Sequence, residues 1–228
     1  MRSTAAVLTL FAFATPAFAQ DPVTVDPAHH KVEIDNAHVR VLRITLGPGE
    51  KTPSHDHPAG VAIYLTDVQG RISPVGAAVN ETPRKRGEVV AVAASKHTVE
   101  NTGKTPFEVV LVEFKNPPSK GWTAGARDAV KVDPKHYTVA AENDHARVLR
   151  VRYGPNEKSV MHDHPANVGV FLKTGKAMMT TADGTTTELP FESGAVQFSD
   201  AHTHLPASSA DGVEVIVVEL KTGAGAKP

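Results

Sequence analysis

The pentapeptide H-D-H-P-A at residues 55–59 returns at residues 162–166, and this repetition decides the fold. Working outward from it, a shift of 107 residues matches the chain to itself without a gap for about 76 positions, of which about a third are identical. A repeat of this length is the size of a small domain and is too long for a solenoid unit. The sequence therefore predicts two tandem copies of one domain.

Within each copy the predicted elements are short and rich in β-branched residues. Val, Leu and Ile dominate residues 38–46, 61–65 and 108–115, and clusters of Gly, Pro, Asn and Thr separate the apolar runs. No stretch keeps a helical period. Many short strands divided by turn residues are typical of a β-sandwich or jelly-roll barrel. We expect an all-β chain.

The chain divides into four predicted segments. Residues 1–19 combine an early Arg, a 14-residue apolar run and an A-x-A site, which together describe a secretory signal peptide cleaved near Ala19-Gln20. An anchoring helix is the alternative, but the run is shorter than the roughly 20 residues that span a bilayer. We expect barrels at 24–115 and 130–222 and a Pro- and Gly-containing linker at 116–129. The mature chain should then be periplasmic or secreted and have no membrane span.

Composition limits the chemistry. The formal net charge is −1, so nothing favours a nucleic-acid partner. There is no cysteine, which excludes disulfides, thiolate metal sites and a cysteine nucleophile. The chain holds 12 histidines, and any metal must be bound by imidazole or oxygen.

The histidines follow the repeat. Ten of them form five pairs under the 107-residue shift, and only His30 and His202 have no partner. The pairs are His29/His136, His38/His145, His55/His162, His57/His164 and His97/His204.

Three of these pairs have the spacing of a metal site. His55 and His57 are two residues apart, so on a strand both side chains point to one face. His97 lies forty residues later, on another strand that a barrel can bring alongside. The second copy repeats this arrangement with His162, His164 and His204. Three neutral imidazoles can bind a divalent transition metal, with Fe(II), Zn, Mn, Ni and Cu all open. The alternative is a surface strand with exposed imidazoles.

The remaining paired residues receive structural interpretations. We expect capping or surface hydrogen bonding for the pairs His29/His136 and His38/His145. Arg40/Arg147 and Arg43/Arg150 fit solvated strand positions or contacts between the barrels. Glu113/Glu219 fit either a structural role or support of the metal ligands.

These motifs resemble the cupin superfamily, and two copies resemble a bicupin. The first cupin motif, G-x5-H-x-H, is present at residues 49–57, and copy two replaces its glycine by Asn156, which tolerates a left-handed backbone. The second motif is present as Gly87, His97 and Asn101; copy two keeps the glycine and histidine as Gly194 and His204 but has Ser208 last. The resemblance spans nearly all of the mature chain and implies two tandem cupin-type jelly-roll β-barrels with three-histidine metal sites.

One departure from the resemblance narrows the function. Germin-like and oxalate-decarboxylase-like cupins carry a Glu ligand shortly after H-x-H, yet neither residues 58–62 nor 165–169 contain a carboxylate. Cupins with three histidine ligands are a better match, and they include non-haem iron dioxygenases. His202 could add a fourth nitrogen in copy two, but a loop histidine is the preferred interpretation.

The signal-peptide pattern and the resemblance together predict an exported metal-binding bicupin, with Fe(II) as the first choice of metal. It would be an oxygenase acting on a small chelating substrate. The alternative is a non-catalytic periplasmic protein that binds metal or a small ligand, so enzyme activity stays open, as does a homodimer.

Overall fold

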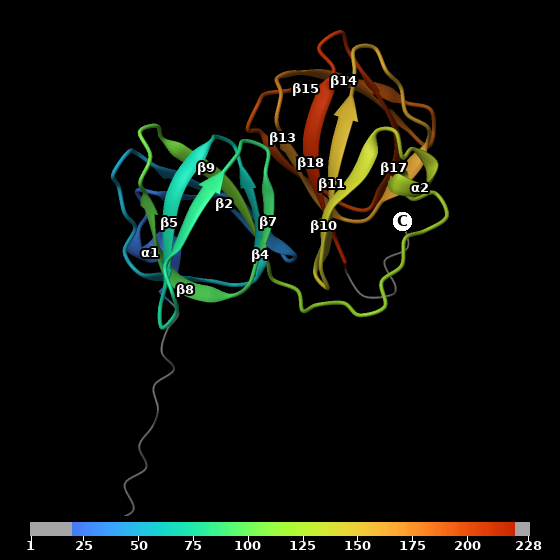
Figure 1. The fold of residues 1–228 in the computed structure, drawn as a ribbon. Helices are drawn as coiled ribbons and strands as arrows, with labels where there is room; N and C mark the ends of the chain where they lie inside the picture. The colour runs from blue at the N-terminus through green and yellow to red at the C-terminus, as the bar shows by residue number, and fades with distance from the viewer. Residues whose placement is uncertain (1–19, 222–228) are drawn as a thin grey trace, which may run out of the picture.

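A computed structural model describes residues 20–221, so the predicted signal peptide at 1–19 lies outside the described residues. Within the described range the strands form four antiparallel sheets, two in each half of the chain (Figure 1). Two four-residue helices, α1 (Pro22–Val25) and α2 (Ala129–Val132), each precede one set of strands. None of the described helices is long and apolar enough to cross a membrane.

The first half folds from a five-stranded and a four-stranded sheet. The larger sheet has the order β1 (His30–Asp35), β2 (Val39–Leu46), β9 (Phe107–Phe114), β4 (Gly60–Tyr64) and β7 (Val89–Val92). The smaller sheet has the order β3 (His55–His57), β8 (Ser95–Asn101), β5 (Val68–Pro74) and β6 (Asn80–Arg84).

The second half repeats this topology strand for strand. Its larger sheet has the order β10 (Tyr137–Glu142), β11 (Ala146–Tyr153), β18 (Val213–Leu220), β13 (Asn167–Phe171) and β16 (Val196–Ser199). Its smaller sheet has the order β12 (His162–His164), β17 (His202–Ser208), β14 (Gly175–Thr181) and β15 (Thr186–Phe191). The all-β prediction of two tandem jelly-roll barrels is confirmed.

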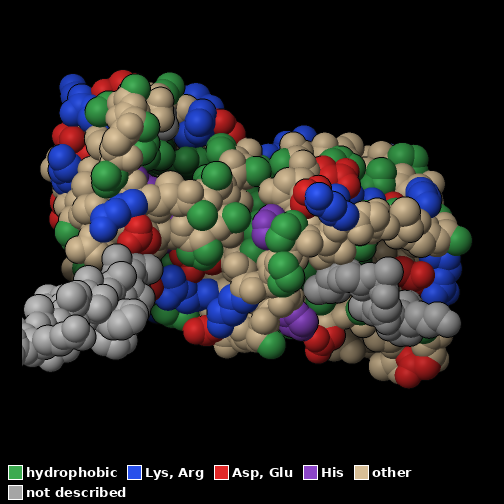
Figure 2. Space-filling model, turned by 90° about the horizontal axis from the view of Figure 1, so that it is seen from below, with side chains coloured by type: hydrophobic (Ala, Val, Ile, Leu, Met, Phe, Trp, Pro, Cys, Tyr) green, Lys and Arg blue, Asp and Glu red, His purple; other side chains and the backbone are tan. Residues whose placement is uncertain are grey.

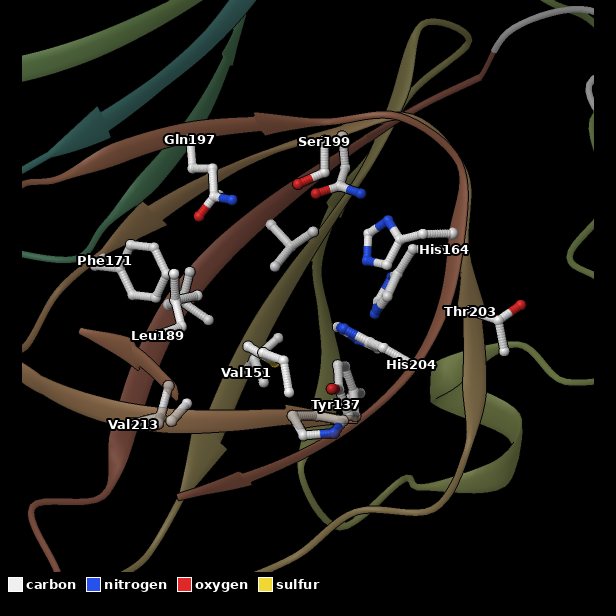
Figure 3. A pocket seen from close by; sticks show the side chains of 18 of the residues that line it. Tyr137, Val151, His164, Phe171, Leu189, Gln197, Ser199, Thr203, His204 and Val213 are labelled. Atoms are coloured by element: carbon white, nitrogen blue, oxygen red, sulfur yellow. The ribbon is translucent and has the colours of Figure 1, made fainter. Parts of the chain in front are cut away.

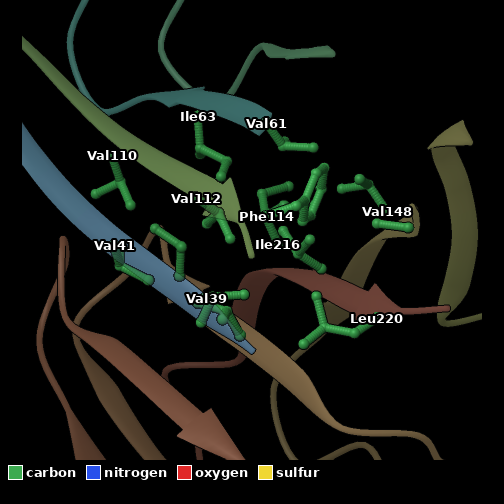
Figure 4. Packing of buried hydrophobic residues seen from close by; sticks show 14 of the residues in the cluster. Val39, Val41, Val61, Ile63, Val110, Val112, Phe114, Val148, Ile216 and Leu220 are labelled. Atoms are coloured by element: carbon green, nitrogen blue, oxygen red, sulfur yellow. The ribbon is translucent and has the colours of Figure 1, made fainter. Parts of the chain in front are cut away.

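The central strands are apolar on both faces because each face is buried against something different. On β2, Leu42 and Leu46 point into the first barrel, while Val39 and Val41 point toward the second barrel. The two five-stranded sheets pack face to face through one shared cluster, in which Val112 and Ile216 are fully buried (Figure 4). Two barrels of this size gain stability by sharing apolar area in this way.

Matched arginines fasten the two barrels together. Arg43 donates to the carbonyl of Gly194 at 2.6 Å, and Arg150 donates to the carbonyl of Gly87 in return. Both glycines have positive φ, and a Cβ added to Gly87 would lie 3.2 Å from Arg150 and Leu172. The predicted contact between barrels is therefore confirmed for this pair of arginines.

Two local predictions also meet the structure. Asn156 has a φ of 57°, close to the 78° of Gly49, so the replaced motif glycine keeps its left-handed backbone. The segment between the barrels packs on the second barrel, where the ring centroid of Trp122 lies 5.0 Å from Cζ of Arg147 and 5.5 Å from Nζ of Lys221. On the face shown in Figure 2, basic and acidic side chains are intermixed over both barrels, in line with the balanced charge.

Candidate metal centres

Each H-D-H motif forms a three-residue strand whose two histidines face the barrel interior. His55 and His57 are buried, whereas Asp56 between them is partly exposed. In the ladder between β3 and β8, His55 pairs with His97, and in the matching ladder His162 pairs with His204. This register places the third histidine directly across from the first, as the sequence predicted. All six predicted ligands thus lie in two clusters.

The second barrel brings three nitrogens to one point. The Nε2 atom of His162 lies 3.1 Å from the Nε2 atoms of both His164 and His204. A metal bound to two imidazoles at about 2.0–2.1 Å and at right angles would separate the two nitrogens by roughly 3 Å. The spacing of the donor set therefore fits a metal ion. Whether a metal binds at these residues stays a prediction.

Hydrogen bonds at the far side of each ring set the tautomer. His162 Nδ1 lies 2.7 Å from the carbonyl oxygen of Val160, and His164 Nδ1 lies 2.7 Å from a carboxylate oxygen of Glu219. An oxygen that only accepts requires Nδ1 to carry the proton. Nε2 is then the nitrogen of each ring that can offer a lone pair, and a cation between the two Nε2 atoms would bind both lone pairs.

A buried carboxylate supports the H-x-H motif in both barrels. Glu219 is fully buried, and its counterpart Glu113 hydrogen-bonds His57 Nδ1 at 2.5 Å. Burial opposes ionisation of Glu113, but the hydrogen bonds from His57 and Arg40 outweigh it and hold the pKa of this carboxyl below its usual value. The sequence left the role of these glutamates open. The structure shows that each glutamate hydrogen-bonds the second histidine of its H-x-H motif and so orients that ring.

Arg40 and Arg147 lie behind these glutamates. Arg147 donates to Glu219 at 2.7 Å and also pairs with Asp128, while Arg40 donates to Glu113 and to Asp21. The prediction of solvated or inter-barrel positions is therefore wrong for this pair. A buried carboxylate next to histidine needs a compensating cation, and the arginine supplies it.

His30 joins the cluster of the first barrel, which the sequence did not predict. Donor nitrogens of His30, His55 and His57 all lie within 4.8 Å of one another. His97, the third ligand that the sequence predicted, is not part of this group of converging nitrogens, although its ring lies beside the group, with its centroid 4.9 Å from that of His55 and 5.4 Å from that of His57. The Nε2 atoms of His30 and His55 are buried and have no hydrogen-bond partner.

His202 lies in the cluster of the second barrel. It begins β17, and its ring centroid is 4.6 Å from that of His204 and 5.6 Å from that of His164. The expectation of a loop histidine is wrong. Each barrel thus gathers four imidazoles, but the fourth comes from β1 in the first barrel and from β17 in the second.

Burial favours the neutral form of six of the clustered imidazoles. Desolvation, together with the neighbouring histidines, lowers the pKa of His30, His97 and His162 to about 4 and that of His204 to about 2. Burial also lowers the pKa of His55 and His202. Metal ligation requires neutral imidazole, so these rings are ready to bind a metal at neutral pH.

The second barrel also holds a cavity of about 420 Å³ next to its cluster. His164 and His204 lie at one end, and Phe171, Leu189 and Val213 line the other (Figure 3). Gln197 and Ser199 add polar groups along one side. Among the lining residues there is no Lys or Arg, and Asp200 is the single acid. A ligand here would have an apolar body and would meet the histidine cluster at one end.

The other two histidine pairs take no part in the clusters. His136 is buried and hydrogen-bonds Asp133 at 2.8 Å and Glu157 at 3.2 Å, and His29 makes the corresponding bonds. Hydrogen bonding is confirmed for this pair. His38 and His145 stack on Phe198 and Phe114 of the opposite barrel, so they lie where the two barrels meet and not on a free surface. His38 also hydrogen-bonds Asn116 at 3.0 Å, so the expected hydrogen bonding is confirmed for this residue.

Comparison with solved structures identifies the fold. AerE from Microcystis aeruginosa superimposes with a TM-score of 0.60 at 14% identity, covering 85% of this chain and 98% of its own. Salicylate 1,2-dioxygenase from Pseudoaminobacter salicylatoxidans, solved with gentisate, gives 0.55 at 12% identity over 80% of this chain and 68% of its own. A cupin 2 conserved barrel domain protein from Leptotrichia buccalis gives 0.54 at 10% identity over 84% of this chain and 88% of its own.

These similarities show that the chain has the cupin jelly-roll fold twice over, as the sequence motifs predicted. No protein-family model matches the chain. No curated protein sequence matches it either.

Proposed function

We propose that the chain is a metal-dependent cupin whose second barrel binds a small chelating molecule and oxidises it with O₂. One observation carries the proposal: donor nitrogens of His162, His164 and His204 converge, and His164 and His204 of this cluster line one end of a 420 Å³ cavity with mainly apolar walls. Fe(II) is our first choice of metal. When bound, it would supply Lewis acidity and open coordination positions. The dioxygenase among the structures of similar fold supports this reaction class by fold analogy only.

The residues around the cavity indicate the class of ligand. Its body would pack on Val151, Phe171 and Leu189, and an amide or hydroxyl could be bound by Gln197 or Ser199. Since no Lys or Arg lines the cavity, an anionic group pointing away from the metal would be buried without a partner. We therefore expect catechols and diketones to bind better than analogues with an added carboxylate.

The test combines metal analysis, ligand titration and oxygen uptake. The chain from Gln20 onward, loaded with Fe(II), should bind catechol or a β-diketone and consume O₂, whereas gentisate should bind at least about tenfold more weakly. Binding without oxygen uptake over the whole panel would identify a non-catalytic ligand-binding protein. Failure to take up any metal on titration would overturn the proposal.

Comparison with the first barrel indicates a substitution that would fill the cavity of the second. It has Phe107 and Leu111 at the places where the second barrel has Val213 and Val217. The substitution Val213→Phe should therefore fill the cavity, reduce catechol binding at least about tenfold and leave the metal content unchanged. If ligand binding persists unchanged in this variant, the ligand does not bind in this cavity.

We also propose that the chain is exported and cleaved before Gln20. In the second copy, Asp163 is paired with the guanidinium of Arg127 at 2.9 Å. At the matching place in the first copy, Asp56 accepts a hydrogen bond from the backbone nitrogen of Gln20 at 2.7 Å. Cleavage of the peptide bond between Ala19 and Gln20 would convert the backbone nitrogen of Gln20 to an α-ammonium. This cation would pair with Asp56 as the guanidinium of Arg127 pairs with Asp163. Intact mass measurement on protein from the periplasm should give a chain beginning at Gln20, and a chain retaining residues 1–19 would contradict this.

A further inference from the structure

The two barrels differ at one position that faces both histidine clusters. His30 pairs with Ile44 in the ladder between β1 and β2, and Tyr137 pairs with Val151 in the matching ladder. Ile44 and Val151 belong to the barrel interiors, so both rings point inward. His30 and Tyr137 are therefore equivalent residues with different chemistry.

The two rings occupy the same place to within a few tenths of an ångström. The centroid of His30 lies 4.9 Å from that of His55 at an interplanar angle of 67°, and Tyr137 lies 4.8 Å from His162 at 68°. Toward the second histidine of each motif the separations are 5.9 Å and 5.7 Å, both at 46°. The replacement thus changes which atoms face the cluster and leaves the ring in position.

The two rings differ in whether their polar atom already has a hydrogen-bond partner. His30 is 2% exposed; its Nδ1 lies 3.1 Å from the carbonyl of Asp26, and its Nε2 has no partner. A buried, unpartnered ring nitrogen is costly unless it finds a ligand. The hydroxyl of Tyr137 is instead bound to Tyr153 at 2.8 Å, so it already has a partner within the protein.

We propose that His30 is a metal ligand, which makes the first barrel a four-histidine centre built from His30, His55, His57 and His97. Such a centre holds its metal as a permanent part of the structure. In the second barrel the hydroxyl of Tyr137 is bound to Tyr153, and the fourth imidazole is His202, which lines the cavity together with His164 and His204. The fourth histidine therefore comes from a different strand in each barrel, and the cluster of the second barrel borders the cavity in which a ligand would bind. This inference rests on the proposed function in that both centres bind metal.

The test isolates each centre in the full mature chain. The double variant His162→Ala/His164→Ala leaves the first centre alone, and His55→Ala/His57→Ala leaves the second alone. Each is loaded with Cu(II), pulsed electron paramagnetic resonance counts the coordinated imidazoles, and release of the metal to a chelator is timed. The substitution His30→Phe is then added to the His162→Ala/His164→Ala variant, because phenylalanine keeps an aromatic ring at this position and removes both nitrogens.

We expect His30→Phe to remove one coordinated imidazole and to speed metal release. Loss of a residue that only supports a ligand commonly weakens metal binding about 10–100-fold, and loss of a ligand should have an effect at least as large. His38→Phe is the matched control, since it removes a histidine that stacks on Phe198 outside the cluster. It should change neither quantity. An unchanged imidazole count in His30→Phe, with the metal still bound, would overturn the inference.

The result also separates this inference from the proposed function. If the second centre binds Cu(II) while His30→Phe has no effect on the first, only the role of His30 is wrong. If neither isolated centre binds the metal, both proposals fail. Thermal unfolding of each variant without metal shows whether a loss of binding reflects a loss of folding.

Discussion

At the scale of single residues, the buried glutamate behind each H-x-H motif sets the properties of the site. Glu219 accepts a hydrogen bond from His164 and is paired with Arg147. This arrangement fixes the ring and its tautomer, and loss of such a partner commonly weakens metal binding about 10–100-fold. Each candidate centre therefore consists of its histidines together with the glutamate and the arginine behind them.

The substitution Glu219→Gln should accordingly weaken metal binding by the second centre about 10–100-fold, because the amide cannot accept from His164 as strongly as a carboxylate. Competition with a chelator measures the effect. Glu214→Gln is the control: Glu214 is on the same strand, where it pairs with Arg150 on the face turned to the other barrel. Equal metal affinity in the two variants would contradict the supporting role of Glu219.

At the scale of elements, the turn that leads to each H-x-H strand is fixed by an acid. Glu157 accepts from the backbone nitrogen of Gly154 at 2.6 Å and pairs with Lys135 and His136. The hydrogen bond from Lys135 and that from Gly154 are the main causes that lower the pKa of Glu157 to about 2. A carboxyl with a lowered pKa stabilises the fold when it is ionised.

The stabilisation by Glu157 should be complete above pH 4.5 and should be lost as the pH falls toward 2. Between these values the Glu157 carboxyl is protonated in the unfolded chain but still ionised in the folded chain. The melting temperature of Glu157→Gln should thus fall below that of the wild type at pH 7, and the gap should narrow below pH 4.5. A gap of constant size from pH 7 to pH 3 would show that ionisation of Glu157 does not contribute.

The elements also show what the sequence could predict. The spacing of His55 and His57 is a local property of a strand, and the repeat pointed to the partner His97, so these residues were found without a structure. The place of His30 depends on the packing of β1 beside β3, which brings His30 to His55, and this long-range contact is not encoded by any local pattern. The one available signal was that the repeat pairs His30 with an aromatic ring, Tyr137.

At the scale of the whole molecule, one apolar cluster is shared between the two five-stranded sheets, and we expect it to make the barrels unfold as one cooperative unit. The sequence showed strands apolar on both faces but could not show that the outer faces meet each other, since that depends on docking of complete sheets. Ile216 is fully buried in this cluster. Removing part of such a side chain costs the burial of the lost atoms and leaves a cavity.

The substitution Ile216→Ala should destabilise the chain by about 2–5 kcal/mol, with a single unfolding transition for both barrels. Denaturant unfolding followed by circular dichroism and by the fluorescence of Trp122, the one tryptophan of the chain, checks this. Two separate transitions, with only the second barrel weakened, would show that the barrels unfold independently.

The central claim is that both histidine clusters bind metal, and elemental analysis of the mature chain tests it most directly. Protein beginning at Gln20, purified without a chelating resin, should contain about two transition-metal equivalents. The count should fall to about one in His55→Ala/His57→Ala and in His162→Ala/His164→Ala, and to none when all four substitutions are combined. A wild-type chain that carries no metal and takes up none on titration would contradict the account.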